Sequence, residues 1–201
     1  MCIRDRIQPD PELSHASNFL YTLTGNKPDK EMERVFDVCL ILHADHTFNA
    51  STFAAREVAS TRAHMYSAVS AAVGALSGEL HGGANYEVMK MLLDIKDENN
   101  ATNWVKSRIE KGDRIMGMGH AVYKTVDPRS MVLKELSKKL SEKTGLPWYN
   151  ITKKVEETTS EIMKNRKERD IFPNVDLYSA SVYYMLTVSY THLTLPTNRE
   201  V

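Results

Sequence analysis

Apolar residues recur every three to four positions along most of this chain, and strictly alternating runs are nearly absent. This spacing collects apolar side chains on one face of an α-helix, whereas a half-buried β-strand needs alternation. In residues 31–42, for example, the apolar face consists of Val35, Val38, Cys39 and Leu42. The pattern therefore predicts an all-α fold.

Start and stop signals divide the helical pattern. Asp127-Pro128 is typical of a helix start, with Asp as the N-cap, and Gly145 and Pro147 end that helix near Thr144. A polar cluster at 49–52 is typical of another cap. The apolar side of the helix after Asp127 should consist of Met131, Leu133, Leu136 and Leu140. Further helices are expected over 53–65, 66–75, 86–96, 103–111, 148–167 and 177–188.

Charge and composition exclude several classes of protein. Lysine plus arginine and aspartate plus glutamate both total 26, so the chain lacks the basic excess typical of nucleic-acid binding. The apolar stretch at 65–76 is too short to span a membrane, and no signal-peptide pattern opens the sequence. Two cysteines form neither a disulfide framework nor a zinc motif. We expect a cytoplasmic protein that contacts neither nucleic acid nor membrane.

The two ends differ from the rest. Residues 1–6 and 189–201 break the helical pattern with unrelated residues and resemble translated adapter sequence. We therefore expect both segments to be non-native and the remainder to be the middle of a longer protein.

His81 lies in the segment Glu79-Leu80-His81-Gly82-Gly83-Ala84-Asn85, between two helical stretches. The paired glycines suggest a sharp turn with positive φ, in which a histidine can face a cleft. This makes His81 the first candidate for a catalytic residue.

Other polar groups also lie at helix ends or in loops: His43, Asp45, His46, His120, Arg129 and Asp176. Each could be only a helix cap or an ordinary surface group. The histidines and aspartate of 43–46 could ligate a metal, but no second carboxylate cluster completes a shell, so no metal site is predicted. Gly117 and Gly119 lack the third glycine and preceding strand of a dinucleotide fingerprint.

Taken together, these motifs are more specific. Leu-His-Ala-Asp-His, Glu-Leu-His-Gly-Gly-Ala-Asn, Met-Gly-His-Ala-Val-Tyr-Lys with Asp-Pro-Arg, and Pro-Asn-Val-Asp follow one another in this order. The series resembles that of citrate synthases, more closely the bacterial and archaeal type, over about 31–188. The resemblance implies a citrate-synthase-like helical fold and condensation of acetyl-CoA with oxaloacetate to citrate and free coenzyme A.

The resemblance also implies roles for individual residues. His81 would hydrogen-bond the thioester carbonyl while Asp176 removes a methyl proton. His120 would polarise the ketone of oxaloacetate, which His46 and Arg129 would also bind. These roles suit the chemistry, because a thioester methyl is a very weak carbon acid and oxaloacetate is a dianion. A neutral histidine near a helix N-terminus can act as a hydrogen-bond donor.

Coenzyme A enters as a thioester co-substrate, and no permanently bound cofactor is implied. The residues that match the family's coenzyme A region are Gly117, Met118, Gly119, Lys124 and Asn174, with Lys167 and Arg169 as further candidates for its phosphates.

The resemblance further implies that residues 7–82 are part of a large helical domain and 83–188 a nearly complete small domain. The family carries two more substrate arginines beyond position 188, one of them donated across a homodimer. We therefore expect the 201 residues alone to have little or no activity, and the full-length protein to be a homodimer.

Two alternatives stay open. A 2-methylcitrate synthase would use propionyl-CoA and share every catalytic position named above, although Leu80 and residues 43–45 lean towards the citrate enzyme. A non-catalytic helical interaction module could also retain the same core.

Overall fold

The computed structural model describes residues 7–44, 48–120, 125–166 and 170–186. Their regular secondary structure is helical, which confirms the predicted all-α class, and the described part contains only one isolated β-bridge. The helices are α1 (His15–Thr24), α2 (Lys30–Ala44), α3 (Ala50–Ser60), α4 (Met65–Leu76), α5 (Gly83–Ile95), α6 (Glu98–Glu110), α7 (Pro128–Thr144), α8 (Trp148–Asn165) and α9 (Val175–Met185).

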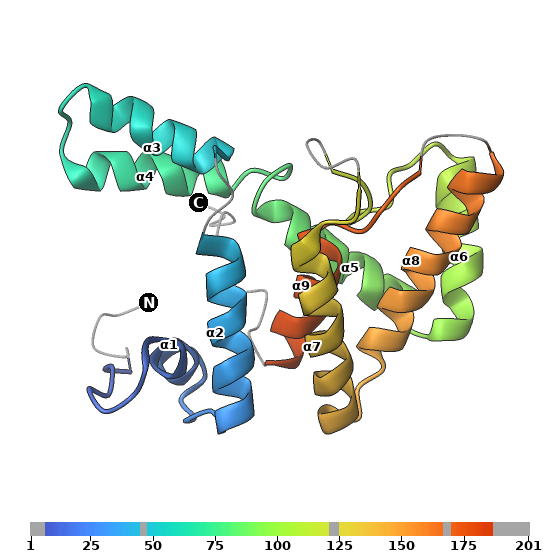
Figure 1. The fold of residues 1–201 in the computed structure, drawn as a ribbon, viewed down its shortest axis with the longest axis horizontal. Helices are drawn as coiled ribbons and strands as arrows, with labels where there is room; N and C mark the ends of the chain where they lie inside the picture. The colour runs from blue at the N-terminus through green and yellow to red at the C-terminus, as the bar shows by residue number, and fades with distance from the viewer. Residues whose placement is uncertain (1–6, 45–47, 121–124, 167–169, 187–201) are drawn as a thin grey trace, which may run out of the picture.

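Helices α5 to α9 form a bundle around one apolar core (Figure 1). Helix α9 is central to this bundle, because it packs against α5, α7 and α8, while α6 lies along α8 at the outer end. Most of α9 is buried, including Leu177, Tyr178 and Val182. Removing these apolar side chains from water is the main favourable term in the folding of such a bundle.

Helices α1 and α2 pack on each other beside the bundle, and α2 also contacts α7. Lys143 near the end of α7 pairs with Asp29 at 2.6 Å and with Glu31 at 2.9 Å. These two ion pairs join the two parts at their surface.

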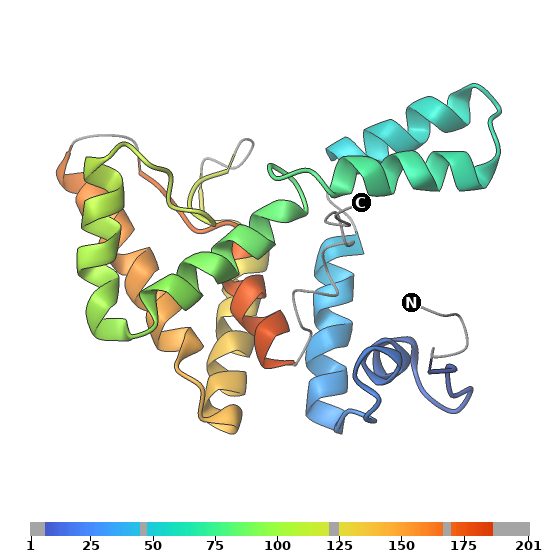
Figure 2. The same cartoon turned by 180° about the vertical axis from the view of Figure 1, so that it is seen from behind.

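Helices α3 and α4 form an antiparallel hairpin that extends away from both parts, as the two opposite views show (Figures 1 and 2). Helix α3 buries no residue in this chain, and α4 buries only Ala68. The loop between α4 and α5, which carries His81, connects the hairpin to the bundle.

The local signals explain where the helices begin and end. The side chain of Asn49 accepts the backbone N–H of Thr52 and caps α3, as predicted for the 49–52 cluster. Asp127 caps α7, and Gly145 ends it with a left-handed conformation at φ 70°. The expected break between two helices near His64 is also confirmed, because His64 is the N-cap of α4.

Several details differ from the sequence expectations. Helix α1 was not expected, although Ser14 caps its start and Gly25 its end. Helix α3 ends at Ser60 and not at Met65, and α5 begins at Gly83 and not at Tyr86. Helix α6 begins five residues before the expected Asn103, because Asp97 caps it. Met131 is 60% exposed and so does not belong to the buried face of α7, whereas Leu133 and Leu140 are fully buried.

None of the helices in the described ranges is both long and apolar enough to cross a membrane.

Candidate active site

Asp176 lies in the first turn of α9, where Asn174 caps the helix by accepting the Asp176 backbone N–H at 2.9 Å. The helix N-terminus favours a negative charge at this position. Burial has the larger effect and raises the pKa of Asp176 to about 6, although the nearby Arg129 charge opposes the rise. Asp176 is therefore a stronger base than an ordinary carboxylate but still ionised at neutral pH.

The loop at 117–119 lies directly against the start of α9. The Gly119 N–H donates to the Phe172 carbonyl at 2.8 Å, and the Asn174 N–H donates to the Gly117 carbonyl at 2.9 Å. The Asn174 side chain also donates to the Gly119 carbonyl at 2.8 Å. The structure thus brings together Gly117, Met118, Gly119 and Asn174, four residues assigned to the coenzyme A region by resemblance.

Gly117 has a structural reason to be glycine. Its φ is +81°, and a Cβ atom there would lie 2.9 Å from the Leu177 Cα. Any other residue would be strained and would push the loop away from α9, and hence away from Asp176.

Arg129 lies in the first turn of α7, and the carboxylate of Asp127, the N-cap of that helix, holds its side chain. Both oxygens of Asp127 accept hydrogen bonds from its guanidinium, Oδ1 from Nε at 3.0 Å and Oδ2 from Nη2 at 2.7 Å. Asp127 is only 1% exposed. Burial alone would raise the Asp127 pKa, but hydrogen bonds from Arg129, its charge and that of His120 hold the pKa below its ordinary value. Asp127 therefore fixes the orientation of the Arg129 guanidinium group.

Two histidines, His120 and His43, lie in the same region as Asp127 and Arg129. His120 is close enough to Asp127, and Arg129 close enough to Asp176, for their charges to influence those carboxylates. His43 at the end of α2 belongs to the same region, since burial and the Arg129 charge lower its pKa. Its Nδ1 donates to the Cys39 carbonyl at 2.8 Å, so it is oriented by its own helix.

His81 hydrogen-bonds Ser51 of α3, with 3.0 Å between Nε2 and Oγ. The Ser51 hydroxyl also lies 2.8 Å from Asn49 Oδ1. A hydroxyl has one hydrogen, and Ser51 donates it to Asn49 Oδ1, so the Ser51 oxygen accepts a hydrogen from Nε2 of His81. His81 is therefore a hydrogen-bond donor at Nε2, the kind of group that the resemblance implies at this position.

The glycines after His81 differ from the prediction. Gly82 has φ −64°, and neither Gly82 nor Gly83 has a positive φ. Their small size serves close packing instead. A Cβ on Gly82 would lie 2.5 Å from the Leu76 carbonyl oxygen, and one on Gly83 would lie 3.0 Å from that of Gly78. The turn at His81 is therefore tight because the backbone folds back on itself.

Sequence reasoning missed the second roles of two residues. Asp127 was expected only as a helix cap, yet it also holds Arg129; the Asp-Pro-Arg spacing was the available signal. Ser51 was seen only as part of a cap, and nothing local indicated its contact with His81, thirty residues away. The predicted site residues His46, Lys124, Lys167 and Arg169 lie outside the described residues.

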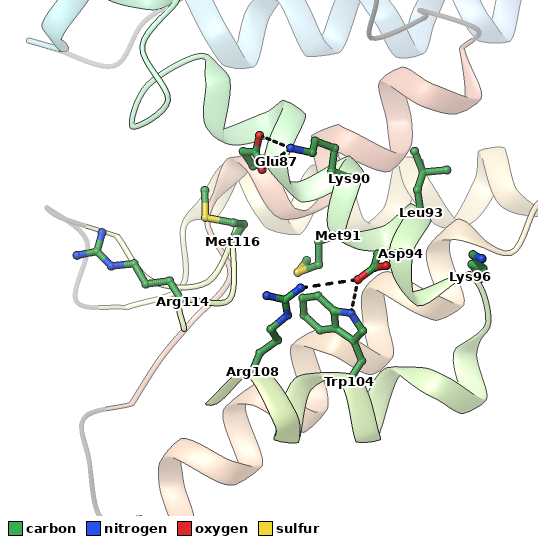
Figure 3. Close-up of a pocket in the computed structure, with 10 residues that line it drawn as sticks. All are labelled: Glu87, Lys90, Met91, Leu93, Asp94, Lys96, Trp104, Arg108, Arg114 and Met116. Carbon is green, nitrogen blue, oxygen red and sulfur yellow. Dashed lines mark hydrogen bonds and ion pairs between the residues drawn. The ribbon is translucent and has the colours of Figure 1, made fainter. Parts of the chain in front are cut away.

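A separate surface pocket of about 650 Å³ lies between α5, α6 and the loop before Gly117 (Figure 3). It contains four cations, but Lys90 pairs with Glu87 and Arg108 with Asp94 within the pocket. None of the predicted catalytic residues lines it. The pocket is therefore distinct from the Asp176 region. Elsewhere, the described part of the chain holds no group of three or more histidine, cysteine or acidic side chains arranged for a metal.

Known proteins resemble this chain in sequence and in fold over most of its length. The family described as "Citrate synthase, C-terminal domain" matches residues 2–196. A citrate synthase from Haloferax volcanii is 46% identical over 92% of this chain and 48% of its own length. A 2-methylcitrate synthase from Corynebacterium glutamicum is 42% identical over 90% of this chain and 47% of its own.

Among solved structures, the chain resembles the citrate synthase of Thermoplasma acidophilum in a ternary complex with carboxymethyl coenzyme A and oxaloacetate. The TM-score is 0.83 and the identity 36%, covering 92% of this chain and 50% of that one. This chain thus spans about half the length of the curated relatives it matches. Motif order, helical fold and these similarities agree: the chain belongs to the citrate synthase family.

Proposed function

We propose that the full-length protein is a citrate synthase that condenses acetyl-CoA with oxaloacetate. The observation that carries this proposal is the position of Asp176. Its partly buried carboxylate lies at a helix N-terminus, beside the Gly117–Gly119 loop and close enough to Arg129 to be influenced by its charge.

In the first step, Asp176 takes a proton from the acetyl methyl group while His81 donates a hydrogen bond to the thioester oxygen. A base with a pKa of about 6 suits this step, because it is deprotonated at neutral pH and more basic than an exposed aspartate. The His81 donor stabilises the negative charge that develops on the oxygen.

In the second step, the enolate carbon attacks the ketone carbon of oxaloacetate. His120 polarises that ketone, and the guanidinium group of Arg129 binds a carboxylate of oxaloacetate. A carbon–carbon bond forms, and the ketone oxygen takes up a proton. Water then cleaves the thioester to give citrate and coenzyme A. His46 also binds oxaloacetate, and Gly117, Met118, Gly119, Lys124 and Asn174 hold coenzyme A, with Lys167 and Arg169 near its phosphates.

The protein is proposed to act in the cytoplasm as a homodimer. Residues 7–82 belong to a large domain and 83–188 to a small one, and the two meet at the paired glycines after His81. The hairpin supports a dimer, because α4 presents an exposed apolar stripe that includes Met65, Val69 and Val73. The same stripe on a second copy of the chain could pack against this one, and both stripes would then be removed from water.

The test uses a full-length version, in which the chain is extended to the length of its relatives. Release of free thiol from acetyl-CoA should require oxaloacetate and fall by roughly 10²–10⁴-fold in Asp176→Asn. No turnover by the full-length protein would contradict the enzyme and favour the interaction module. The 201-residue chain, tested beside it, should show little or no turnover.

A second candidate is a 2-methylcitrate synthase, favoured by the relative of that name at 42% identity. Parallel assays with acetyl-CoA and propionyl-CoA distinguish the two. A higher kcat/KM for propionyl-CoA would replace the first proposal with the second.

A further inference from the structure

A partly buried hydrogen bond joins α5, the helix that follows His81, to α9, which carries Asp176 in its first turn. Nδ2 of Asn85 in α5 donates to Oγ of Ser179 in α9 at 2.5 Å. Ser179 is fully buried and Asn85 partly buried. The two residues lie 94 positions apart in sequence, so this contact exists only because the bundle brings α5 against α9.

The position of this bond relative to the site is its most informative feature. Asn85 follows His81 by four residues, and Ser179 follows Asp176 by three. Ser179 is therefore about one helical turn, roughly 5 Å along the axis, from Asp176, and Asn85 lies in the first turn of α5, which begins two residues after His81. The Ser179 hydroxyl also lies 3.5 Å from the Asp176 carbonyl oxygen, within its own helix.

His81 and Asp176 need a fixed separation, because they would act on adjacent atoms of one small acetyl group. A misplacement of about 1 Å at a reacting centre can reduce a rate by roughly a hundredfold. Apolar packing between two helices tolerates small sliding movements, whereas a directional hydrogen bond restricts the register.

We infer that Asn85 and Ser179 form a positioning pair that sets the separation of His81 and Asp176. This inference rests on the proposed condensation. Neither residue touches substrate in this role; each acts through the helix that it fixes.

The same helix provides a matched control. Ser181 of α9 hydrogen-bonds Ser137 of α7 at 2.8 Å, and both are fully buried. Removing the Ser181 hydroxyl likewise deletes a side-chain hydrogen bond between α9 and a neighbouring helix. It leaves the contact between α5 and α9 in place.

The experiment compares Ser179→Ala, Asn85→Ala, the double variant and Ser181→Ala in the full-length version. The pair variants should lower kcat by roughly 10- to 100-fold while KM for both substrates changes less than about twofold. The double variant should be no slower than the worse single one, because the two residues act as a unit. The isotope effect with trideuterated acetyl-CoA should increase, since proton removal becomes slower. Ser181→Ala should lower Tm by a similar amount but keep kcat within about twofold.

If the pair variants match Ser181→Ala in kcat and isotope effect, the inference is wrong, and the wild-type turnover still supports the proposed function. If the wild type shows no turnover, the proposed function fails and the inference with it. If Ser179→Ala does not fold, Asn85→Ala decides alone, because its side chain is only partly buried.

Discussion

The α3–α4 hairpin and the α5–α9 bundle are both built from amphipathic helices, but they bury very different amounts of apolar surface. In the bundle, Val88, Leu133 and Ile151 are completely buried. In the hairpin, Met65 is 75% exposed and Tyr66 77%, and Leu80 just after it is 84% exposed.

This difference teaches that helical periodicity predicts an apolar face but not its partner. The bundle finds its partners within the chain, since α9 inserts between α5, α7 and α8. The hairpin lacks such a partner within the described residues, so its stripe can be covered only by surface from elsewhere. The candidate site follows this division: His81 lies at the junction and Asp176 on the bundle, while Ser51, which hydrogen-bonds His81, lies on the hairpin.

The largest expected effect is on folding stability. Leu140→Ala in the bundle should lower the free energy of unfolding by about 2–5 kcal/mol, because it leaves a cavity. Leu76→Ala in the hairpin, where the leucine is 45% exposed, should cost less than about 0.5 kcal/mol. Urea unfolding of the 201-residue chain measures both. Equal losses would show that the hairpin is buried in solution.

The next effect concerns the hairpin stripe. Val69→Lys combined with Val73→Lys should weaken the dimer of the full-length version by roughly a hundredfold or more, because two charges enter an apolar contact. Sedimentation velocity over a concentration series measures this shift. Val132→Lys, at a valine of α7 that is 42% exposed, is the control and should leave the dimer unchanged. A dimer that survives the double substitution would refute the stripe as its interface.

A smaller effect comes from the ionisation of Asp176. Its pKa of about 6 in the folded state exceeds the ordinary value of 3.8, so folding favours the protonated form. The stability contribution is fully present below about pH 4 and is lost as the pH rises through 6, at a cost of about 1–3 kcal/mol. Asp176→Asn should therefore be more stable than the wild type above pH 6.

Urea unfolding from pH 4 to pH 8 measures this difference. Asp94→Asn, at a side chain that is 61% exposed, is the matched control and should change little. A wild type whose stability rises between pH 4 and pH 6, relative to Asp176→Asn, would show that the carboxylate is not destabilised by burial.

The smallest effect tests the contact between hairpin and junction. Ser51→Ala in the full-length version should lower kcat by about three- to tenfold, the equivalent of one ordinary hydrogen bond to His81. Thr61→Ala removes a hydroxyl that bonds the Val58 carbonyl at the other end of α3, and it should leave kcat unchanged. Steady-state thiol release measures both, and equal rates for Ser51→Ala and wild type would remove Ser51 from the site.

The sequence by itself determined the helical class, most helix boundaries and the identity of the family. The spacing of apolar residues, the helix caps and the turn glycines act on neighbours within one or two helical turns. They can therefore be recognised in short stretches of sequence, as at Asp127 and Gly145. The order of several unrelated motifs also identified Asp176, His81 and Arg129 as candidates.

Only the tertiary structure decided how these residues meet. The Ser51 contact with His81 and the Asn85–Ser179 bond join residues 30 and 94 positions apart, and they depend on side-chain geometry that spacing does not specify. The same holds for Gly82, where packing against the Leu76 carbonyl, not a positive φ, excludes a larger side chain. Local patterns choose helices because their energies are local, whereas the contacts of a site arise from helices that pack across long distances in sequence.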